Sequence, residues 1–322
     1  YDVHGCVARS RRTIRTVFDH APGPERRLRR WCRREAGPPL RRYNASMQNI
    51  TTATPLKRIA LGLQYDGTAW HGYQKQEDGQ TVQDQLENAL EQFARVRLAT
   101  TCAGRTDTGV HALEQVVHFD TELNRDVHSW VRGVNAFLPK SIAVRWAREL
   151  PGDPTVNDFF HARFSARART YHYVLYNNAT RSPLVEGRAG FFFRPLDVEL
   201  MRQAVQPLLG WHDFTAFRAA QCQAKSPVKL MHDIRIERHG DCVIFTITAN
   251  AFLHHMVRNL VGSLVYIGTG REKPEWLGHL LESKDRHAAA PTFMPDGLYL
   301  AKIDYDPKWE LPQDSSSALP WF

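Results

Sequence analysis

The 322-residue sequence has no apolar run approaching the roughly 18 residues that a membrane-spanning helix needs. Its five cysteines are scattered and form no C-x-x-C pair, which argues against a disulfide framework and against a thiolate zinc site. P-loop, G-x-G-x-x-G, H-E-x-x-H and Ser-His-Asp signatures are also missing. These absences exclude the commonest membrane, nucleotide-binding and metalloprotease classes, and the cysteine usage predicts a reducing cytoplasm.

Residues 47–322 carry no net charge. The formal net charge of +8 comes from 42 Lys and Arg against 34 Asp and Glu. Residues 1–46 carry 12 Arg, no Lys and 4 acidic residues, so the remaining 30 basic and 30 acidic residues cancel. Global charge therefore says nothing about a nucleic-acid partner of residues 47–322.

The first 46 residues stand apart from the rest of the sequence. They contain Arg clusters and little apolar periodicity, and Met47 follows them. Three interpretations compete: a disordered basic arm, a targeting peptide, or upstream sequence joined to a chain that starts at Met47. A transit peptide should be poor in acids and rich in Ser, whereas this segment has four acids and two Ser. We favour upstream read-through.

Regular apolar patterning begins at residue 57. Alternation predicts strands over 57–65, 98–104, 114–121, 141–150, 168–176, 232–240, 241–249 and 297–305. Helical periodicity appears over 81–96, 127–138, 197–210, 252–268 and 275–284, with Thr81 as the N-cap of the first. The class predicted is α+β with a mainly antiparallel sheet. A Pro- and Gly-containing linker at 151–158 divides it into halves at 55–158 and 159–310, and a tail follows at 311–322.

The segment CAGRTDTGVHA, residues 102–112, places Asp107 between two glycines just beyond a predicted strand. Taken alone, an Asp in such a loop most often caps a turn by accepting backbone N–H groups. A second cluster, ARFSARARTYHY at 162–173, interleaves Arg163, Arg167 and Arg169 with tyrosines. That pattern is typical of RNA binding, although a solvated edge strand would show it equally well.

A third cluster, NAFLHHMVRNLVG at 250–262, places Arg258 in an apolar helical stretch. We expect this arginine to pair with a carboxylate inside the protein, and Asp107 is the natural candidate. His254 and His255 should diverge by about 100° on a helix and have no acid or cysteine at ligand spacing. No metal site is therefore predicted.

Together these clusters resemble the TruA-type tRNA pseudouridine synthases. The resemblance runs from about residue 57 to 306 and includes YDGTAWHGYQKQ, CAGRTDTGVHALEQVVHF, VNAFLP, DFFHARFSARARTYHYVLY, DFTAFRAAQCQ, NAFLHHMVRNLVGSL and GLYLAKIDY. It implies the pseudouridine synthase fold, with two α/β-sandwich-like halves around a central RNA-binding cleft. It also implies an isomerase that detaches uracil, rotates it and rejoins it through carbon at positions 38, 39 and 40 of the tRNA anticodon stem-loop.

The resemblance also assigns roles to individual residues. Asp107 aligns with the catalytic nucleophile, and attack on the sugar or on the ring stays open. Arg105 would hold the target nucleotide out of the stack, and Arg258 would pair with the aspartate and keep it ionised. Tyr171 would stack on the base and is a candidate proton carrier, and Leu298 would pack near the uracil. The resemblance implies a homodimer acting on tRNA, with no metal or organic cofactor because the isomerisation is redox-neutral.

Three positions depart from the commoner family pattern: Thr108, Tyr73 and the segment PTFMPDG at 291–297. None of them is the nucleophile. Two other functions stay open at this point. A non-catalytic RNA chaperone of the same fold would have had no need to keep the aspartate, its arginine and the tyrosine together. A carboxylate-based glycosidase acting on free nucleosides would need a second catalytic acid, and the motifs offer no obvious one.

Overall fold

The computed structural model describes residues 55–312 and residue 319. These residues all belong to one unit of the chain, Thr52–Phe322. The predictions made for residues 1–46 lie outside the described residues. Within the described part, no helix combines the length and the apolar character needed to cross a membrane.

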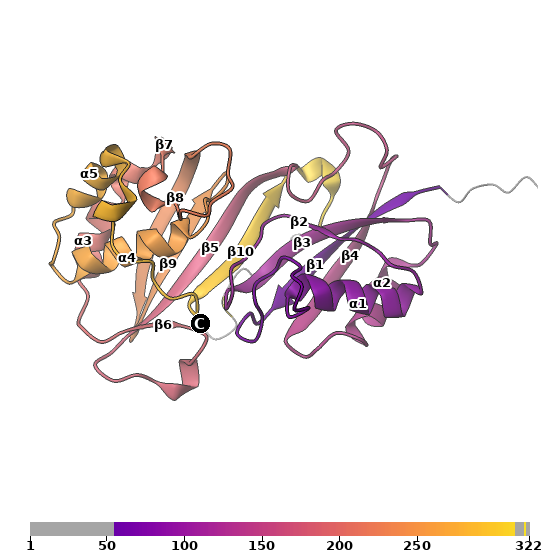
Figure 1. Ribbon diagram of the computed structural model, residues 1–322, viewed down its shortest axis with the longest axis horizontal. Helices are drawn as coiled ribbons and strands as arrows, with labels where there is room; N and C mark the ends of the chain where they lie inside the picture. The colour runs from indigo at the N-terminus through magenta and orange to yellow at the C-terminus, as the bar shows by residue number, and fades with distance from the viewer. Residues whose placement is uncertain (1–54, 313–318, 320–322) are drawn as a thin grey trace, which may run out of the picture. The chain divides into compact units, whose positions relative to one another are not determined.

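A ten-stranded sheet runs through the described residues in the order β4-β1-β3-β10-β5-β9-β8-β7, with β2 beside β3 and β6 beside β5 (Figure 1). The strands are β1 Lys57–Tyr65, β2 Thr101–Cys102, β3 His111–Thr121, β4 Ile142–Leu150, β5 Ala166–Asn177, β6 Gly190–Phe192, β7 Gly210–Asp213, β8 Val228–His239, β9 Cys242–Ala249 and β10 Leu298–Tyr305. The β10–β3 and β5–β6 pairs are parallel, and the other pairs described are antiparallel. The predicted α+β class with a mainly antiparallel sheet is confirmed.

The helices form two groups along this sheet. They are α1 Val82–Ala94, α2 Val127–Asn135, α3 Val198–Ala204, α4 Met256–Gly268 and α5 Trp276–Ser283, with 3₁₀ turns at Pro183–Val185, Gln206–Leu208, Thr215–Phe217, Arg286–Ala288 and Pro307–Trp309. In Figure 1, α1 and α2 lie beside the part built from β1, β3 and β4, whereas α3, α4 and α5 lie beside the part built from β8 and β9. Both groups of helices bury their apolar side chains in the same continuous core.

Strand β10 joins the two parts of the sheet. Its Leu300 lies opposite Ala112 of β3 on one side and opposite Tyr171 of β5 on the other. Although β10 comes last in the chain, it lies between β3, which follows the Asp107 loop, and β5, which carries Tyr171. The predicted linker at 151–158 falls in the loop between β4 and β5. The division into two domains stays a prediction.

Two helix starts show where sequence patterns succeed and fail. The Thr81 hydroxyl accepts the N–H of Asp84 at 3.2 Å, so α1 begins at the predicted cap. Helix α4 begins at Met256 rather than at residue 252, because His255 adopts a left-handed conformation with φ of 62°. The predicted helical start at 252 is wrong. Strands β6 and β7 were missed because three or four residues are too few to show alternation.

Candidate active site

Asp107 lies in the loop 104–109, which connects β2 to β3, and two inward-facing side chains hold that loop in place. Thr106 is buried, and its hydroxyl lies 2.8 Å from the hydroxyl of Tyr65 on β1. Gln115 of β3 donates its side-chain N–H to the carbonyl of Gly104 at 2.5 Å and accepts the Gly104 N–H at 3.4 Å. These bonds anchor the loop on both sides of Arg105 and immediately before Asp107.

The glycine-rich loop between β1 and α1 packs directly against the Asp107 loop. Gly72 has a φ of +88°, and a Cβ there would lie 2.7 Å from the carbonyl oxygen of Thr106. A Cβ on Gly67 would lie 2.0 Å from the carbonyl oxygen of Val110, which is closer than atoms can approach. Tyr73 N–H donates to that same Thr106 carbonyl at 3.0 Å. A side chain at either glycine would therefore displace the backbone that carries Asp107.

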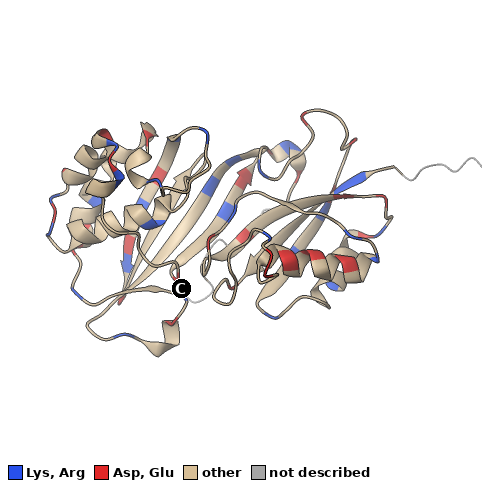
Figure 2. Ribbon diagram, in the orientation of Figure 1, with Lys and Arg blue, Asp and Glu red and all other residues tan. Residues whose placement is uncertain are grey.

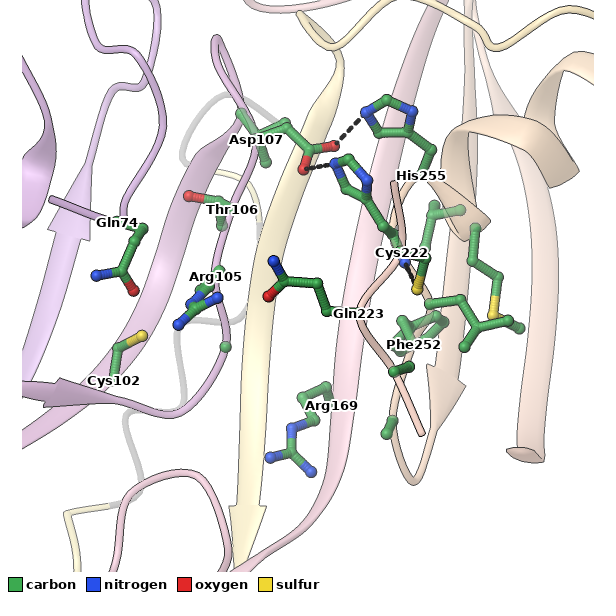
Figure 3. A pocket seen from close by; sticks show the side chains of 18 of the residues that line it. Gln74, Cys102, Arg105, Thr106, Asp107, Arg169, Cys222, Gln223, Phe252 and His255 are labelled. Carbon is green, nitrogen blue, oxygen red and sulfur yellow. Dashed lines mark hydrogen bonds and ion pairs between the residues drawn. The ribbon is translucent and has the colours of Figure 1, made fainter. Parts of the chain in front are cut away.

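Three basic side chains surround the Asp107 carboxylate, whose side chain is 24% exposed. Arg258 Nη1 lies 3.3 Å from Oδ2, and His254 Nε2 lies 3.3 Å from Oδ1. His255 Nε2 lies 3.4 Å from Oδ2, and Figure 3 shows His255 beside the Asp107 carboxylate. The Arg258 Nε also donates to the carbonyl of Phe293 at 2.8 Å, which fixes the guanidinium in place. The ion pair expected between Arg258 and Asp107 is thus present across 151 residues of sequence.

The two histidines do not diverge as predicted. Both precede α4, and the left-handed backbone of His255 brings the two rings to a centroid distance of 3.9 Å. Both rings therefore face Asp107, and the expectation that they lack an acidic partner is wrong. Burial lowers the pKa of His255, which outweighs the attraction of the carboxylate.

One ligand atom from each of Asp107, His254 and His255 lies within 4.8 Å of the others, which is a spacing that a divalent cation could bridge. However, Arg258 is in contact with the same carboxylate, and its positive charge opposes a second cation there. The absence of a metal cofactor stays a prediction.

The residues to which the resemblance assigns roles all line one pocket: Arg105, Asp107, Tyr171, Arg258 and Leu298. Arg105 is exposed on its wall, and Leu298 is buried at the start of β10. Tyr171 is 9% exposed, and its ring packs edge-on against Phe252 at 5.0 Å. Burial raises the pKa of Tyr171, and the Asp107 charge adds to this effect. The Tyr171 hydroxyl is therefore protonated at neutral pH.

This pocket has a volume of about 1400 Å³ and is lined from both parts of the sheet. Among its described lining residues, Asp107 is the single carboxylate. The cationic Lys and Arg side chains of the lining are Arg105, Arg163, Arg169, Lys225, Lys229 and Arg258. Figure 2 shows a contrasting concentration of acidic residues along α1. The positive charge that global composition conceals is thus concentrated in the lining of this pocket, as binding of a polyanion requires.

The three arginines of the second cluster have different roles. Arg169 is pinned by four backbone carbonyls, among them those of Ala103 at 3.2 Å and Arg163 at 2.7 Å. Arg167 forms an ion pair with Asp306. Arg163 is exposed in the pocket. The edge-strand alternative is wrong, because β5 lies between β10 and β9, and the RNA-binding interpretation fits Arg163 best.

His111 was missed by sequence reasoning, although it belongs to the GVHA motif. It is 2% exposed, and its Nδ1 accepts the N–H of Gly67 at 3.0 Å. Its Nε2 donates to the carbonyl of Asp296 at 2.9 Å, and its ring stacks on Tyr299 at 4.5 Å. Burial lowers the pKa of His111, which keeps it neutral, so one nitrogen accepts and the other donates. His111 thereby ties together loops that are remote in sequence.

The family pattern described as tRNA pseudouridine synthase matches residues 63–165 and 204–306. The chain belongs to the tRNA pseudouridine synthase family. It is 68% identical over 265 residues to tRNA pseudouridine synthase A of Janthinobacterium sp. (strain Marseille), covering 82% of this chain and 98% of that protein. It is 65% identical to tRNA pseudouridine synthase A of Herminiimonas arsenicoxydans, covering 82% of this chain and 96% of that protein. The resemblance drawn from the motifs is confirmed.

A solved structure of an H/ACA RNP bound to a substrate RNA containing 2'-deoxyuridine aligns with a TM-score of 0.30 at 11% identity, covering 64% of this chain and 44% of that chain. That likeness is too weak to carry an argument. The assignment to the tRNA pseudouridine synthases rests on the family match and on the relatives of high identity.

Proposed function

We propose that this chain converts uridine to pseudouridine in tRNA, with Asp107 as the nucleophile. The observation that carries the proposal is the environment of Asp107. It is the one carboxylate among the described residues of a cationic pocket, and it is partly exposed and in contact with Arg258. Membership of the tRNA pseudouridine synthase family supports the same reaction.

A carboxylate nucleophile suits this reaction because it divides the exchange of the C1′–N1 bond for a C1′–C5 bond into two easier steps. The Asp107 oxygen forms a bond to C1′ of the ribose while the C1′–N1 bond breaks and its electrons remain on uracil. The uracil rotates, and C5 then forms a bond to C1′ and displaces the carboxylate. C5 loses its proton and N1 gains one, so no oxidant or reductant is needed. Attack at ring carbon C6 is the alternative, and it also returns the carboxylate unchanged.

The other pocket residues support this step by positioning the substrate. Arg258 holds the carboxylate facing the pocket through its second bond to the Phe293 carbonyl. Tyr171 and Leu298 lie on neighbouring strands and offer an apolar surface to the uracil. Arg105, next to the anchored Gly104, would occupy the space that the flipped nucleotide leaves, which offsets part of the flipping cost of a few kcal/mol.

The pocket argues against the glycosidase alternative. A glycosidase needs a second carboxyl group within about 10 Å of the first to donate a proton or activate water. Asp107 has arginine and histidine around it instead, and no other carboxylate is found among the described lining residues.

We place the target uridines at positions 38, 39 and 40 of the anticodon stem-loop, and the enzyme in the cytoplasm as a homodimer. These finer statements rest on the resemblance to TruA-type enzymes. A two-fold dimer would carry two copies of the cationic pocket and would offer an L-shaped tRNA a longer binding surface than one subunit does. Light scattering at micromolar concentration tests the dimer, and an active monomer would contradict it.

The reaction is tested with an unmodified tRNA transcript. After incubation with the purified chain, carbodiimide probing maps pseudouridine at single-nucleotide resolution. We expect modification within positions 38–40 by the wild type, and none by Asp107→Asn. Free uridine should not react, which separates the proposal from a nucleoside glycosidase. Wild-type protein that leaves every uridine of several tRNAs unmodified would sink the proposal.

A further inference from the structure

Phe164 is a large apolar side chain that the described fold leaves open to solvent. It is 76% exposed, yet it lines the same pocket as Asp107. Its ring stacks on the imidazole of His161, with a centroid distance of 4.2 Å and an interplanar angle of 29°. One face of the Phe164 ring therefore packs on His161, while most of the ring is open to solvent.

The turn that carries Phe164 is rigidly bonded. His161 Nδ1 accepts the backbone N–H groups of Arg163 at 3.1 Å and of Phe164 at 3.3 Å. The Ser165 hydroxyl accepts the His161 N–H at 2.9 Å, and the Ser165 N–H donates to the His161 carbonyl at 2.9 Å. The ring of His161 in turn packs edge-on against His118 at 4.9 Å. These contacts order the backbone of the turn, and the stack on His161 supports the Phe164 ring.

The same turn is linked to the Asp107 loop through Arg169, which is half-buried. Arg169 Nη2 donates to the carbonyl of Arg163 in the turn and to the carbonyl of Ala103, which directly precedes Gly104. Figure 3 shows Arg169 on the pocket wall together with Arg105 and Asp107. The position of Phe164 is thereby set relative to the proposed nucleophile.

We propose that Phe164, supported by His161, is a stacking platform for a nucleobase of the RNA other than the target uridine. Arg163 lies beside it, with its guanidinium carbon 5.8 Å from the ring centroid, and provides a cation for the adjoining phosphate. An exposed aromatic ring next to an arginine in a cationic groove is the combination that binds single-stranded nucleic acid. The inference rests on the proposed function, because it assumes that RNA occupies this pocket.

The chain offers a matched control in Phe193. This ring is 55% exposed and has Arg194 5.4 Å from its centroid, but neither residue lines the pocket. If exposed Phe–Arg pairs contributed to RNA binding regardless of position, Phe193 and Phe164 would behave alike. If Phe164 acts through its place in the pocket, the two should differ.

The experiment compares Phe164→Ala, Phe164→Trp and Phe193→Ala in the full chain, with steady-state kinetics on a tRNA transcript. We expect Phe164→Ala to raise KM about tenfold while changing kcat much less, because a base–aromatic stack contributes to binding. Phe164→Trp keeps a stacking face and should restore KM to within about threefold of wild type. Phe193→Ala should match wild type in both constants. Filter binding of the same tRNA should reproduce the order of affinities.

Each other outcome points to a specific failure. An active wild type with an unchanged KM in Phe164→Ala overturns the platform and leaves the proposed reaction intact. A wild type that binds tRNA but makes no pseudouridine overturns the reaction, and filter binding still tests the platform. A change of oligomeric mass in Phe164→Ala would show that a second copy of the chain covers the ring, which also overturns the inference. Melting curves of each variant exclude misfolding as the cause.

Discussion

The loop 104–109 and the turn 252–255 meet at one carboxylate but are held by different means. The loop depends on many interactions, with Thr106 and Gln115 bonded beneath it and glycines pressed against it. The turn is held by the Ala219 N–H, which donates to the His254 carbonyl at 3.0 Å, and by the His254 N–H, which donates to Cys222 Sγ at 3.4 Å, and it also places His255 in a left-handed conformation. The comparison shows that both segments are bonded to other parts of the fold, but that of the two only the turn places a non-glycine residue in a left-handed conformation.

The largest effect should come from Asp107→Asn, which removes the charge in the loop and keeps its shape. We expect pseudouridine formation to fall by at least about 1,000-fold, because a neutral amide cannot act as the nucleophile. Affinity for tRNA and melting temperature should stay near those of wild type. The matched control is Thr108→Ala in the same loop, which should retain turnover. Turnover near wild type in Asp107→Asn would remove this residue from the mechanism.

On the other side of the site, Arg258→Met should cost about 100- to 1,000-fold in kcat, the range for loss of a strong electrostatic contact in an active site. The substitution removes the cation at Asp107 and leaves the Phe293 carbonyl without its Arg258 donor. Arg258→Lys should recover only part of the loss, because an ammonium group cannot reach both partners in the same geometry. The control is Arg271→Met, whose guanidinium stacks on Tyr266 outside the pocket. Equal kcat in the Met variants at 258 and 271 would contradict the assignment.

Much of the loop 104–109 could be predicted from the sequence, and so could the ion pair between Arg258 and Asp107, but the shape of the turn 252–255 could not. The alternation of β1, the Thr81 cap and the glycines of the Asp107 loop are local signals with local consequences. The convergence of His254 and His255 depends on one left-handed residue inside an apolar stretch, which leaves no trace in helical periodicity. The role of Arg169 was hidden for a related reason, because its carbonyl partners lie on segments far apart in the chain.

A smaller effect is expected at Tyr171, which lies between the loop 104–109 and the turn 252–255. Burial and the nearby Asp107 raise the pKa of Tyr171, so the phenol stays protonated throughout neutral pH and can donate but not accept a proton. Tyr171→Phe keeps the ring, so KM should hold while kcat falls by about fivefold, the value of one hydrogen bond to the substrate of roughly 1 kcal/mol. The shape of the pH–rate profile between pH 6 and 9 should not change. A fall of several hundredfold would instead make the hydroxyl an obligatory proton carrier.

The smallest effect, and the sharpest test of the contrast, concerns His255. Its φ of 62° favours glycine, and a residue with a Cβ is disfavoured there by roughly 1 kcal/mol. His255→Gly and His255→Ala both remove the imidazole, so any shared loss of kcat reports the ring. The difference between them reports the backbone: the Gly variant should be more stable than the Ala variant by about 1 kcal/mol in urea unfolding. If the left-handed turn positions His254 and starts α4 ahead of Arg258, the Gly variant should also keep more turnover. Equal stability and equal turnover in the two variants would show that the turn does not depend on this angle and that its hydrogen bonds with Ala219 and Cys222 hold it instead.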